Sequence, residues 1–264
     1  MKILALDSSG LVATVAVAED EVLTAEYTVN YKKTHSQTLI PMLQAIKDMI
    51  ELDLSTIDAI AIAAGPGSFT GLRIGSATAK GLGLALSKPL IEVPTVIGLA
   101  CNLWGTEKLV CPIMDARRNQ VYTGIYSFER EAGENGSSTY RMQTLKEQCA
   151  ADVSEIAEEL NRLAGSLSKE VIFLGDGVPV YRDILSEKMT VPYSFAPAHL
   201  NRQRAASVAA VAQHYYIEGK TVSAGEHQPD YLRLSQAERE RLEQEQSEKE
   251  QAGQVQEIDN DKGI

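Results

Sequence analysis

The amino-acid sequence predicts an α/β protein in which helices pack on mixed sheets in two related halves. Three observations support this class. The first half is expected to contain three strands, a helix, a strand, a second helix and a short strand, an order typical of helices packed on a mixed sheet. A weaker copy of the opening recurs 108 residues later. Hydrophobic residues make up 44% of the 264 residues, which is enough for a buried core.

The first expected element is a buried strand, because residues 3–6 are apolar and are followed by Asp7. A turn at residues 8–10 separates it from residues 12–18, which are rich in β-branched side chains. Residues 22–31 then alternate in polarity. Three strands joined by tight turns predict a meander.

A helix is expected next, because Thr34 and Ser36 can cap a segment whose apolar residues keep helical spacing to about residue 51. Pro41 requires the first turn of this helix to be loose or kinked. The remaining elements expected in this half are a strand, a helix and a short strand, at 57–63, 70–86 and 90–93.

The second half opens with another apolar strand, which ends at Asp115 in the place of Asp7. The elements expected after it are a strand, a helix, a strand and an Ala-rich helix, at 120–128, 153–164, 171–174 and 207–216. We therefore expect two lobes, at 1–103 and 104–234, and the helix near 205–218 is expected to pack back on the first lobe.

Residues 235–264 differ sharply from the rest in composition. They contain nine acids and four bases, a charge of −5, which leaves −6 of the total −11 for the first 234 residues. A segment with almost no large apolar side chain cannot bury enough surface to offset its ordering entropy. We expect an acidic tail that is disordered or forms a solvated helix.

Charge and cysteine content exclude several function classes. The 36 acids against 25 bases argue that the chain does not hold a phosphate backbone by itself, because such binding needs Lys and Arg. The three cysteines form no C-x-x-C pair, which excludes a disulfide framework and a zinc knuckle and predicts a reducing compartment. No apolar run approaches the ~18 residues of a membrane span. We expect a cytoplasmic protein without membrane contact.

The glycine-rich stretch at residues 65–75 is the most unusual segment of the chain. It lies between an expected strand and an expected helix, where backbone N–H groups can bind phosphate. Its spacing matches neither a Walker A loop nor a dinucleotide fingerprint. Anion binding, close packing and an ordinary turn therefore remain open at this point.

Small residues recur every four positions after this turn, at Gly71, Gly75, Ala79 and Gly83. This spacing places them on one helix face. Each glycine costs a helix up to ~1 kcal/mol relative to alanine. Close packing, inside the chain or against a partner, would offset that cost.

Asp7 and Asp115 are candidate ligands of a metal-bound nucleotide in a cleft between the halves. The alternative is that Asp ends each strand because its side chain favours turns. For Asp115 this alternative is favoured, because no Gly or Thr follows it to bind phosphate. The four histidines are never three or four residues apart, so no helical zinc pair can form. The sequence indicates no metal site and no catalytic constellation.

Several motifs together resemble the TsaB (YeaZ) family. They are Ile3-Leu4-Ala5-Leu6-Asp7-Ser8-Ser9, the helix start at 35–41, the segment 65–75, Ile113-Met114-Asp115-Ala116-Arg117 and Pro229-Asp230-Tyr231-Leu232-Arg233. The resemblance covers about residues 1–234. It implies the two-lobed fold of actin and the sugar kinases (ASKHA), and a role in making threonylcarbamoyladenosine next to the anticodon of tRNA.

The resemblance also implies a division of labour. In this family's pathway the transferase is the paralogue TsaD, which works with TsaB and the ATPase TsaE, and TsaB is an essential partner rather than the catalytic subunit. TsaD carries a His-x-x-x-His metal pair, and the matching positions of this chain hold Thr95 and Leu99. Thr is a poor metal ligand and Leu is none. We therefore expect no catalytic residue and tRNA contact only through the complex.

The resemblance further implies that the helices near 35–51 and 70–86 bind TsaD or a second copy of the chain. The interface residues expected on this basis are His35, Leu39, Met42, Leu43, Ile46, Gly71, Leu72, Arg73, Gly75, Ala79 and Gly83. We expect no cofactor of the chain's own, and any ATP or ADP at the interface with the partner. The candidates for nucleotide contact are Asp7, Ser9, Gly65 and Gly67. The alternative functions are an ATP-dependent phosphotransferase and, more remotely, a peptidase.

Overall fold

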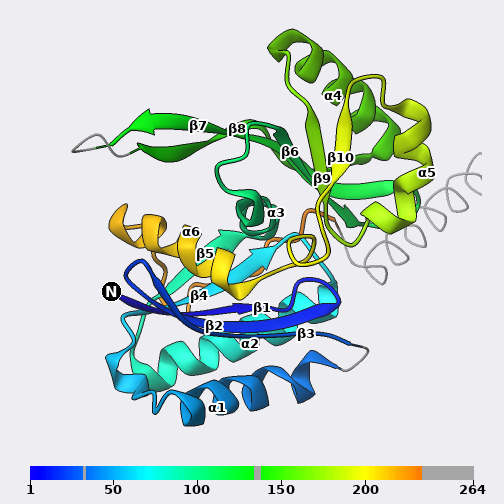
Figure 1. Ribbon diagram of the computed structural model, residues 1–264. Helices are drawn as coiled ribbons and strands as arrows, with labels where there is room; N and C mark the ends of the chain where they lie inside the picture. Colours follow the sequence, from blue (N-terminus) through cyan, green and yellow to red (C-terminus); the bar gives the residue numbers. More distant parts are fainter. Residues whose placement is uncertain (32–33, 134–137, 234–264) are drawn as a thin grey trace, which may run out of the picture. The chain divides into compact units, whose positions relative to one another are not determined.

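The computed structural model describes residues 1–31, 34–133 and 138–233, and the fold belongs to a unit that runs from Met1 to Asp230. Its strands form two five-stranded mixed sheets (Figure 1). The first sheet has the order β3-β2-β1-β4-β5, with β1 (Lys2–Asp7), β2 (Val12–Glu19), β3 (Val22–Asn30), β4 (Ala59–Gly65) and β5 (Leu90–Pro94). β1 pairs antiparallel with β2 and parallel with β4. The predicted meander is confirmed.

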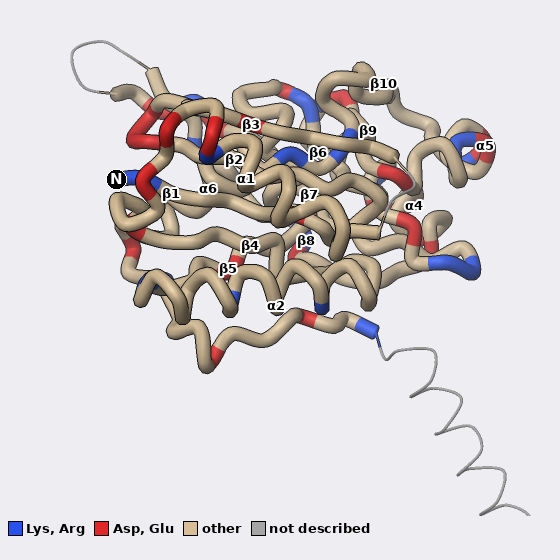
Figure 2. The backbone as a smooth tube through the Cα atoms, turned by 90° about the horizontal axis from the view of Figure 1, so that it is seen from below, with Lys and Arg blue, Asp and Glu red and all other residues tan. Residues whose placement is uncertain are grey.

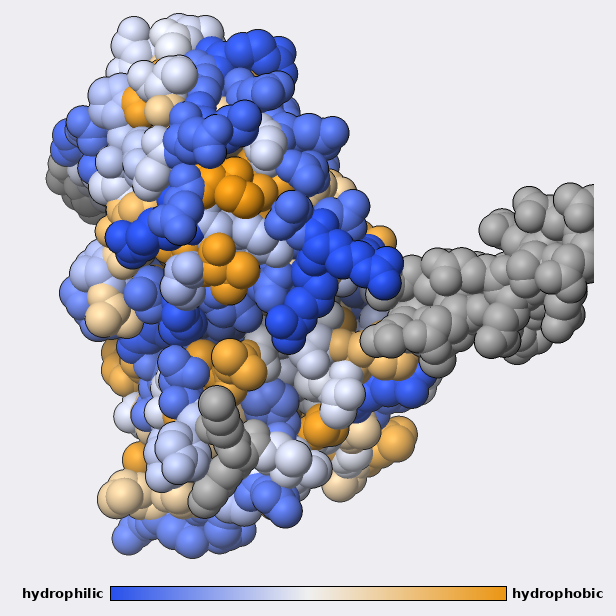
Figure 3. All heavy atoms as spheres, turned by 90° about the vertical axis from the view of Figure 1, so that its right-hand side faces the viewer, coloured by the Kyte–Doolittle hydropathy of each residue, from blue (hydrophilic) through white to orange (hydrophobic). Residues whose placement is uncertain are grey.

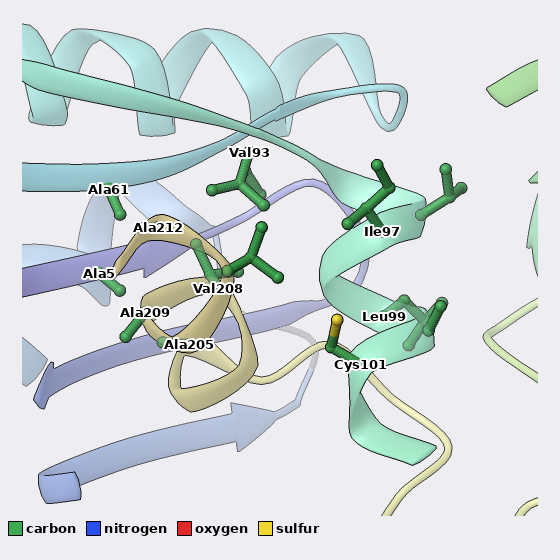
Figure 4. Close-up of a cluster of buried hydrophobic side chains, with 14 of the residues drawn as sticks. Ala5, Ala61, Val93, Ile97, Leu99, Cys101, Ala205, Val208, Ala209 and Ala212 are labelled. Carbon is green, nitrogen blue, oxygen red and sulfur yellow. The ribbon is translucent and has the colours of Figure 1, made fainter. Parts of the chain in front are cut away.

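Helices cover both faces of the first sheet (Figure 1). One face carries α1 (Leu39–Met49) and α2 (Phe69–Leu86), and the other carries α3 (Thr95–Ala100) and α6 (Ala205–Ile217). Because side chains alternate along a strand, Ile3 and Ala5 point to the α3–α6 side, and Leu4 and Leu6 point to the α1–α2 side. Figure 4 shows the first of these cores, where small side chains let α6 approach the sheet.

The start of α1 explains how the chain accommodates Pro41. A short 3-10 turn, η1 (His35–Gln37), precedes the helix, so α1 begins at Leu39 rather than at Thr34 or Ser36. Pro41 is then the third residue of the helix, and the first helical bond is donated by the Met42 N–H. A proline in this position removes no hydrogen bond, because the first N–H groups of a helix have no helical partner.

The second sheet repeats the topology of the first. Its order is β10-β9-β6-β7-β8, with β6 (Leu109–Asp115), β7 (Gln120–Ala132), β8 (Ser138–Asp152), β9 (Val171–Leu174) and β10 (Tyr193–Phe195). Strands β6 to β10 therefore take the places of β1 to β5. This duplication confirms the predicted α/β fold of ASKHA type. A third core joins this sheet to α4 (Val153–Leu167) and α5 (Val178–Lys188).

Three elements of the second half, β8, α5 and β10, are missing from the expectations drawn from the sequence. β8 is an edge strand whose side chains are mostly half-buried or exposed, so its sequence lacks a clear alternation. α5 buries only a few side chains and is otherwise polar. The division into lobes at residue 103 stays a prediction, and the tail 235–264 lies outside the described residues. Among the described residues, no helix is both long enough and apolar enough to cross a membrane.

Candidate functional site

The glycine-rich turn after β4 joins three distant parts of the chain. Gly65 has a φ of +134°, and a Cβ there would lie 2.2 Å from the Asp230 carbonyl oxygen. The Asp230 N–H donates to the Ala64 carbonyl at 2.7 Å. A Cβ on Gly67 would lie 2.4 Å from the Ser9 carbonyl oxygen. Both glycines are therefore needed for close backbone approach, and this turn is a packing junction between β1, β4 and the C-terminal strap at 221–230.

The small residues of α2 face their own sheet. A Cβ on Gly71 would lie 2.1 Å from the Ser8 carbonyl oxygen, and a Cβ on Gly75 would lie 2.4 Å from Ser8 Oγ. A Cβ on Gly83 would lie 2.5 Å from Leu90 Cδ1. The stripe thus lets α2 lie directly on the β1 turn and β5. Small residues in this helix could serve close packing inside the chain or against a partner, and the geometry supports packing inside the chain.

This burial corrects most of the expected interface. The residues that are buried within the chain itself are Leu39, Met42, Leu43, Ile46, Gly71, Leu72, Gly75, Ala79 and Gly83. They support the first sheet, and a partner can reach only the opposite sides of α1 and α2. His35 is half-buried and its Nε2–H donates to the Gly10 carbonyl at 2.8 Å. Arg73 is exposed, with its guanidinium 4.1 Å from the centre of the Phe69 ring.

The outward sides of these two helices form what we call the outer face, composed of Ile40, Pro41, Gln44, Met49, Arg73, Ala77, Gly81 and Leu84. Three large apolar side chains are exposed on this face: Ile40, Met49 and Leu84 are 51%, 83% and 68% exposed. Over their whole length α1 and α2 carry three bases and one acid, although the chain as a whole is strongly acidic (Figure 2). In contrast, the side that shows α5 is predominantly hydrophilic (Figure 3). The outer face has the composition of a protein-binding surface.

Asp7 lies at the end of β1 in a buried turn. Its Oδ1 accepts hydrogen bonds from the Ser9 N–H at 2.8 Å and from Ser9 Oγ at 2.6 Å. Burial raises the pKa of the Asp7 carboxyl to about 6, against the lowering effect of these two bonds. Next to this turn, Gln203 is buried with neither amide atom hydrogen-bonded, and it packs against Gly10.

The matching turn in the second half contains Asp115 and Asp176. Asp115 Oδ1 accepts from the Tyr181 hydroxyl and from the Arg117 N–H, each at 2.8 Å. Asp176 Oδ1 accepts from the Asp115 N–H at 3.3 Å, and burial raises the pKa of the Asp176 carboxyl. These bonds fit the interpretation of Asp115 as a turn residue. Nucleotide contact at Asp7, Ser9, Gly65 and Gly67 stays a prediction.

The positions that correspond to the TsaD metal pair lie in the hydrophobic core. Thr95 and Leu99 both belong to α3, and they are 0% and 1% exposed. Leu99 packs in the cluster shown in Figure 4, and Thr95 Oγ1 has no hydrogen-bond partner. Across the described ranges, no group of three His, Cys, Asp or Glu side chains is arranged to hold a metal ion.

Sequence reasoning missed three features of these sites. Asp176 carries a signal similar to that of Asp7, an acid close to the end of an apolar strand, and could have been found by it. The exposed Ile40 and Leu84 could have been found by helical periodicity, because they lie opposite the buried positions of α1 and α2. Gln203 carries no sequence signal, because its burial depends on contacts between distant segments.

Comparison with known proteins gives one consistent result. The family model described as "TsaD: tRNA N6-adenosine threonylcarbamoyltransferase" matches residues 23–241. The tRNA threonylcarbamoyladenosine biosynthesis protein TsaB of Bacillus subtilis is 29% identical over 238 residues, which cover 90% of this chain and 96% of that protein. The TsaB of Escherichia coli is 30% identical over 236 residues, 88% of this chain and 95% of that protein.

A solved structure agrees with these relatives. YeaZ from Pseudomonas aeruginosa has a TM-score of 0.71 and 27% sequence identity, and the match covers 88% of this chain and 99% of that one. A second structure from the same organism, described as similar to peptidase YEAZ, has a TM-score of 0.69 at 26% identity. The similarity therefore extends over the two sheets and their helices.

Proposed function

The chain belongs to the TsaB family of tRNA threonylcarbamoyladenosine biosynthesis proteins, and we propose that it serves this pathway as a non-catalytic subunit. It binds and supports the transferase TsaD together with the ATPase TsaE, and it meets tRNA only within that complex. The single observation that carries the proposal is the outer face of α1 and α2, with its exposed apolar side chains.

The outer face suits a stable protein partner for a physical reason. Burying Ile40, Met49 and Leu84 would remove apolar surface from water, at about 25 cal/mol for each Å². The small residues Ala77 and Gly81 between them allow a partner helix to lie close to α2. Few charges need to be desolvated there. A second copy of the chain could use the same surface, so a homodimer would compete with TsaD.

The core position of Thr95 and Leu99 supports the absence of catalysis by this subunit. A metal ion at this place would need two imidazole ligands, and the chain offers an unpartnered hydroxyl and an alkyl group. We accordingly propose no cofactor of the chain's own and no peptidase activity. ATP or ADP would bind at the interface with the partner.

Reconstitution tests the proposed role. TsaD, TsaE, the threonylcarbamoyl-adenylate donor, ATP and tRNA are combined with and without this chain, and modified adenosine is measured by mass spectrometry. The proposal expects modification only when the chain is present. Equal modification without it would contradict the proposal.

The interface is tested by a matched pair of substitutions. Leu84→Asp places a charge on the outer face and is expected to abolish co-elution with TsaD. Val180→Asp changes a similarly exposed side chain on α5, at 58% exposure, and should leave the complex intact. Gly75→Asp would be a poor test, because its side chain would collide with Ser8 inside the chain. Normal co-elution of Leu84→Asp would place the interface elsewhere.

The alternative of an ATP-dependent phosphotransferase rests on the fold class alone, with Asp7 and Gly67 near the phosphate. It predicts tight binding of ATP·Mg by the isolated chain, lost in Asp7→Ala. The absence of binding at millimolar ATP would exclude it. The carboxylate of Asp115 already accepts hydrogen bonds from Tyr181 and Arg117 within its own turn, which favours the partner role.

A further inference from the structure

A pocket of about 290 Å³ lies between η3 (Cys101–Leu103) and α6, and it is separate from the outer face of α1 and α2. Cys101 and Trp104 form one side, and Ala206, Ala210 and His214 of α6 contribute to the other. Its size is close to the lower end of the range typical of small-molecule sites. None of the motifs discussed above includes these residues.

Two aromatic rings line this pocket, one from each side. The Trp104 and His214 rings are nearly parallel, with an interplanar angle of 12° and centroids 6.2 Å apart. Phe128 supports Trp104 from the core, with centroids 5.1 Å apart and an angle of 55°. Trp104 is nevertheless 45% exposed. A large aromatic surface is thus held in place but left open to solvent.

The helical side of the pocket is open because its residues are small. Ala206, Ala210 and His214 follow one another at intervals of four along α6 and therefore share a face. The two alanines leave space next to the half-exposed ring of Trp104, where an aromatic ring can bind.

A hydrogen-bond network fixes the two sides relative to each other. Asn102 Nδ2 donates to the carbonyls of Leu200 at 2.8 Å and Arg202 at 2.7 Å. The Ser207 hydroxyl donates to Asn102 Oδ1 at 2.6 Å. η3 and the start of α6 are therefore tied together, and the pocket exists before any ligand binds. Preformed sites lose less affinity to ordering.

His214 and Cys101 are the titratable side chains that line the pocket. Within the described part of the chain, no Asp, Glu, Lys or Arg lines the pocket. Burial raises the pKa of the Cys101 thiol to about 12, so this group is a neutral thiol and not a thiolate. A phosphate or carboxylate group would find no Lys or Arg side chain in this lining to pair with.

We propose that this pocket binds an uncharged planar aromatic ligand of the nucleoside class, whose ring stacks on Trp104. Stacking on an aromatic side chain is available to every base, because every base has a π-face. Ser207 and His214 also line the pocket, and their side chains carry hydrogen-bonding groups for the polar atoms of the ring.

Trp104 is the only tryptophan of the chain, so its fluorescence reports on this pocket alone. The full chain is titrated with adenosine, and Trp104 emission is followed together with the midpoint of thermal unfolding. We expect a saturable change in emission with half-saturation at roughly 0.1–1 mM, as for a ligand of this size. AMP should bind no more tightly than adenosine, and cyclohexanol, which is not planar, should give no saturable change.

Ala210→Leu tests the location, because the new side chain fills the pocket and leaves Trp104 in place. Ala210 is exposed on the helix and leucine has a similar helix propensity, so folding should be retained. We expect at least tenfold weaker binding, whereas Ala85→Leu on the exposed side of α2 should bind as the unchanged protein does. Ala206→Leu is the second blocking variant if Ala210→Leu unfolds early.

Two results would overturn the proposal. One is binding by both blocking variants with the affinity of the unchanged protein. The other is the absence of a saturable change in Trp104 emission up to the solubility limit of adenosine, including the case in which the unfolding midpoint rises because adenosine binds elsewhere.

Discussion

Thr95 and Thr14 are both fully buried threonines, but only one of the two hydroxyls has a hydrogen-bond partner. Thr14 Oγ1 accepts from the Ala205 N–H at 3.1 Å and lies 2.6 Å from Thr28 Oγ1. Thr95 Oγ1 has none. Thr95→Val should therefore raise the free energy of unfolding by about 1 kcal/mol, because an unpaired hydroxyl is costly to bury. Thr14→Val should lower it by about 1–3 kcal/mol. Urea denaturation measures both, and destabilisation by Thr95→Val would refute the argument.

Asp7 should make the stability of the protein fall as pH rises. The folded-state pKa of about 6 lies above the ordinary value of 3.8, so the folded protein binds the proton more tightly than the unfolded chain does. Stability from this group is complete below pH ~4 and is lost as pH rises through 6, by at most about 3 kcal/mol.

Asp7→Asn separates this effect from other titrating groups. The amide oxygen can still accept from Ser9, but it carries no charge. The variant should be more stable than the unchanged protein at pH 7.5 and should lose that advantage near pH 4. Urea denaturation at both pH values checks this, and an equal difference at the two values would show that Asp7 does not titrate in this range.

Helix α2 shows what a sequence pattern can and cannot predict. The spacing of Gly71, Gly75, Ala79 and Gly83 correctly indicated a common face and close packing. It could not indicate what that face packs against, because close approach needs small side chains whether the neighbour is a partner or the chain's own sheet. The same ambiguity applies to Leu39 and Leu43 of α1, which are expected at a partner interface and are buried within the chain itself.

Two glycines of this helix should respond oppositely to the same substitution. A Cβ on Gly71 would lie 2.1 Å from a backbone oxygen of Ser8, which cannot move aside without shifting the β1 turn. Gly71→Ala should cost about 1–3 kcal/mol. Gly81 has no atom within 4 Å of such a Cβ, so Gly81→Ala should stabilise the protein by about 0.5–1 kcal/mol through helix propensity. Thermal unfolding of the two variants compares them, and changes of the same sign would contradict the inward orientation of the stripe.

For the whole molecule, the sequence predicted the duplicated α/β architecture because apolar strands that end in Asp7 and Asp115 are visible locally. The equivalence of the two sheet orders was not visible, because β8 is a half-exposed edge strand. Part of the candidate site was predictable from family motifs. The partners of those motifs, such as Asp230 against Gly65 and Gln203 against Gly10, depend on three-dimensional contacts that no local pattern records.

The net charge of the whole chain predicts that the isolated protein does not bind tRNA. A net charge of −11 repels a polyanion, and phosphate binding gains its free energy from counterions released by Lys and Arg. The isolated chain should bind tRNA more weakly than roughly 10⁻⁴ M at physiological salt, as measured by fluorescence anisotropy. A variant that lacks residues 235–264 keeps a charge of −6 and should also fail to bind.

If only the shortened chain bound tRNA, the bases of α1 and α2 would be a nucleic-acid surface that the tail counteracts. If the full chain bound, another surface of the body would have to overcome its charge, and the proposal that tRNA is met only through TsaD would be wrong.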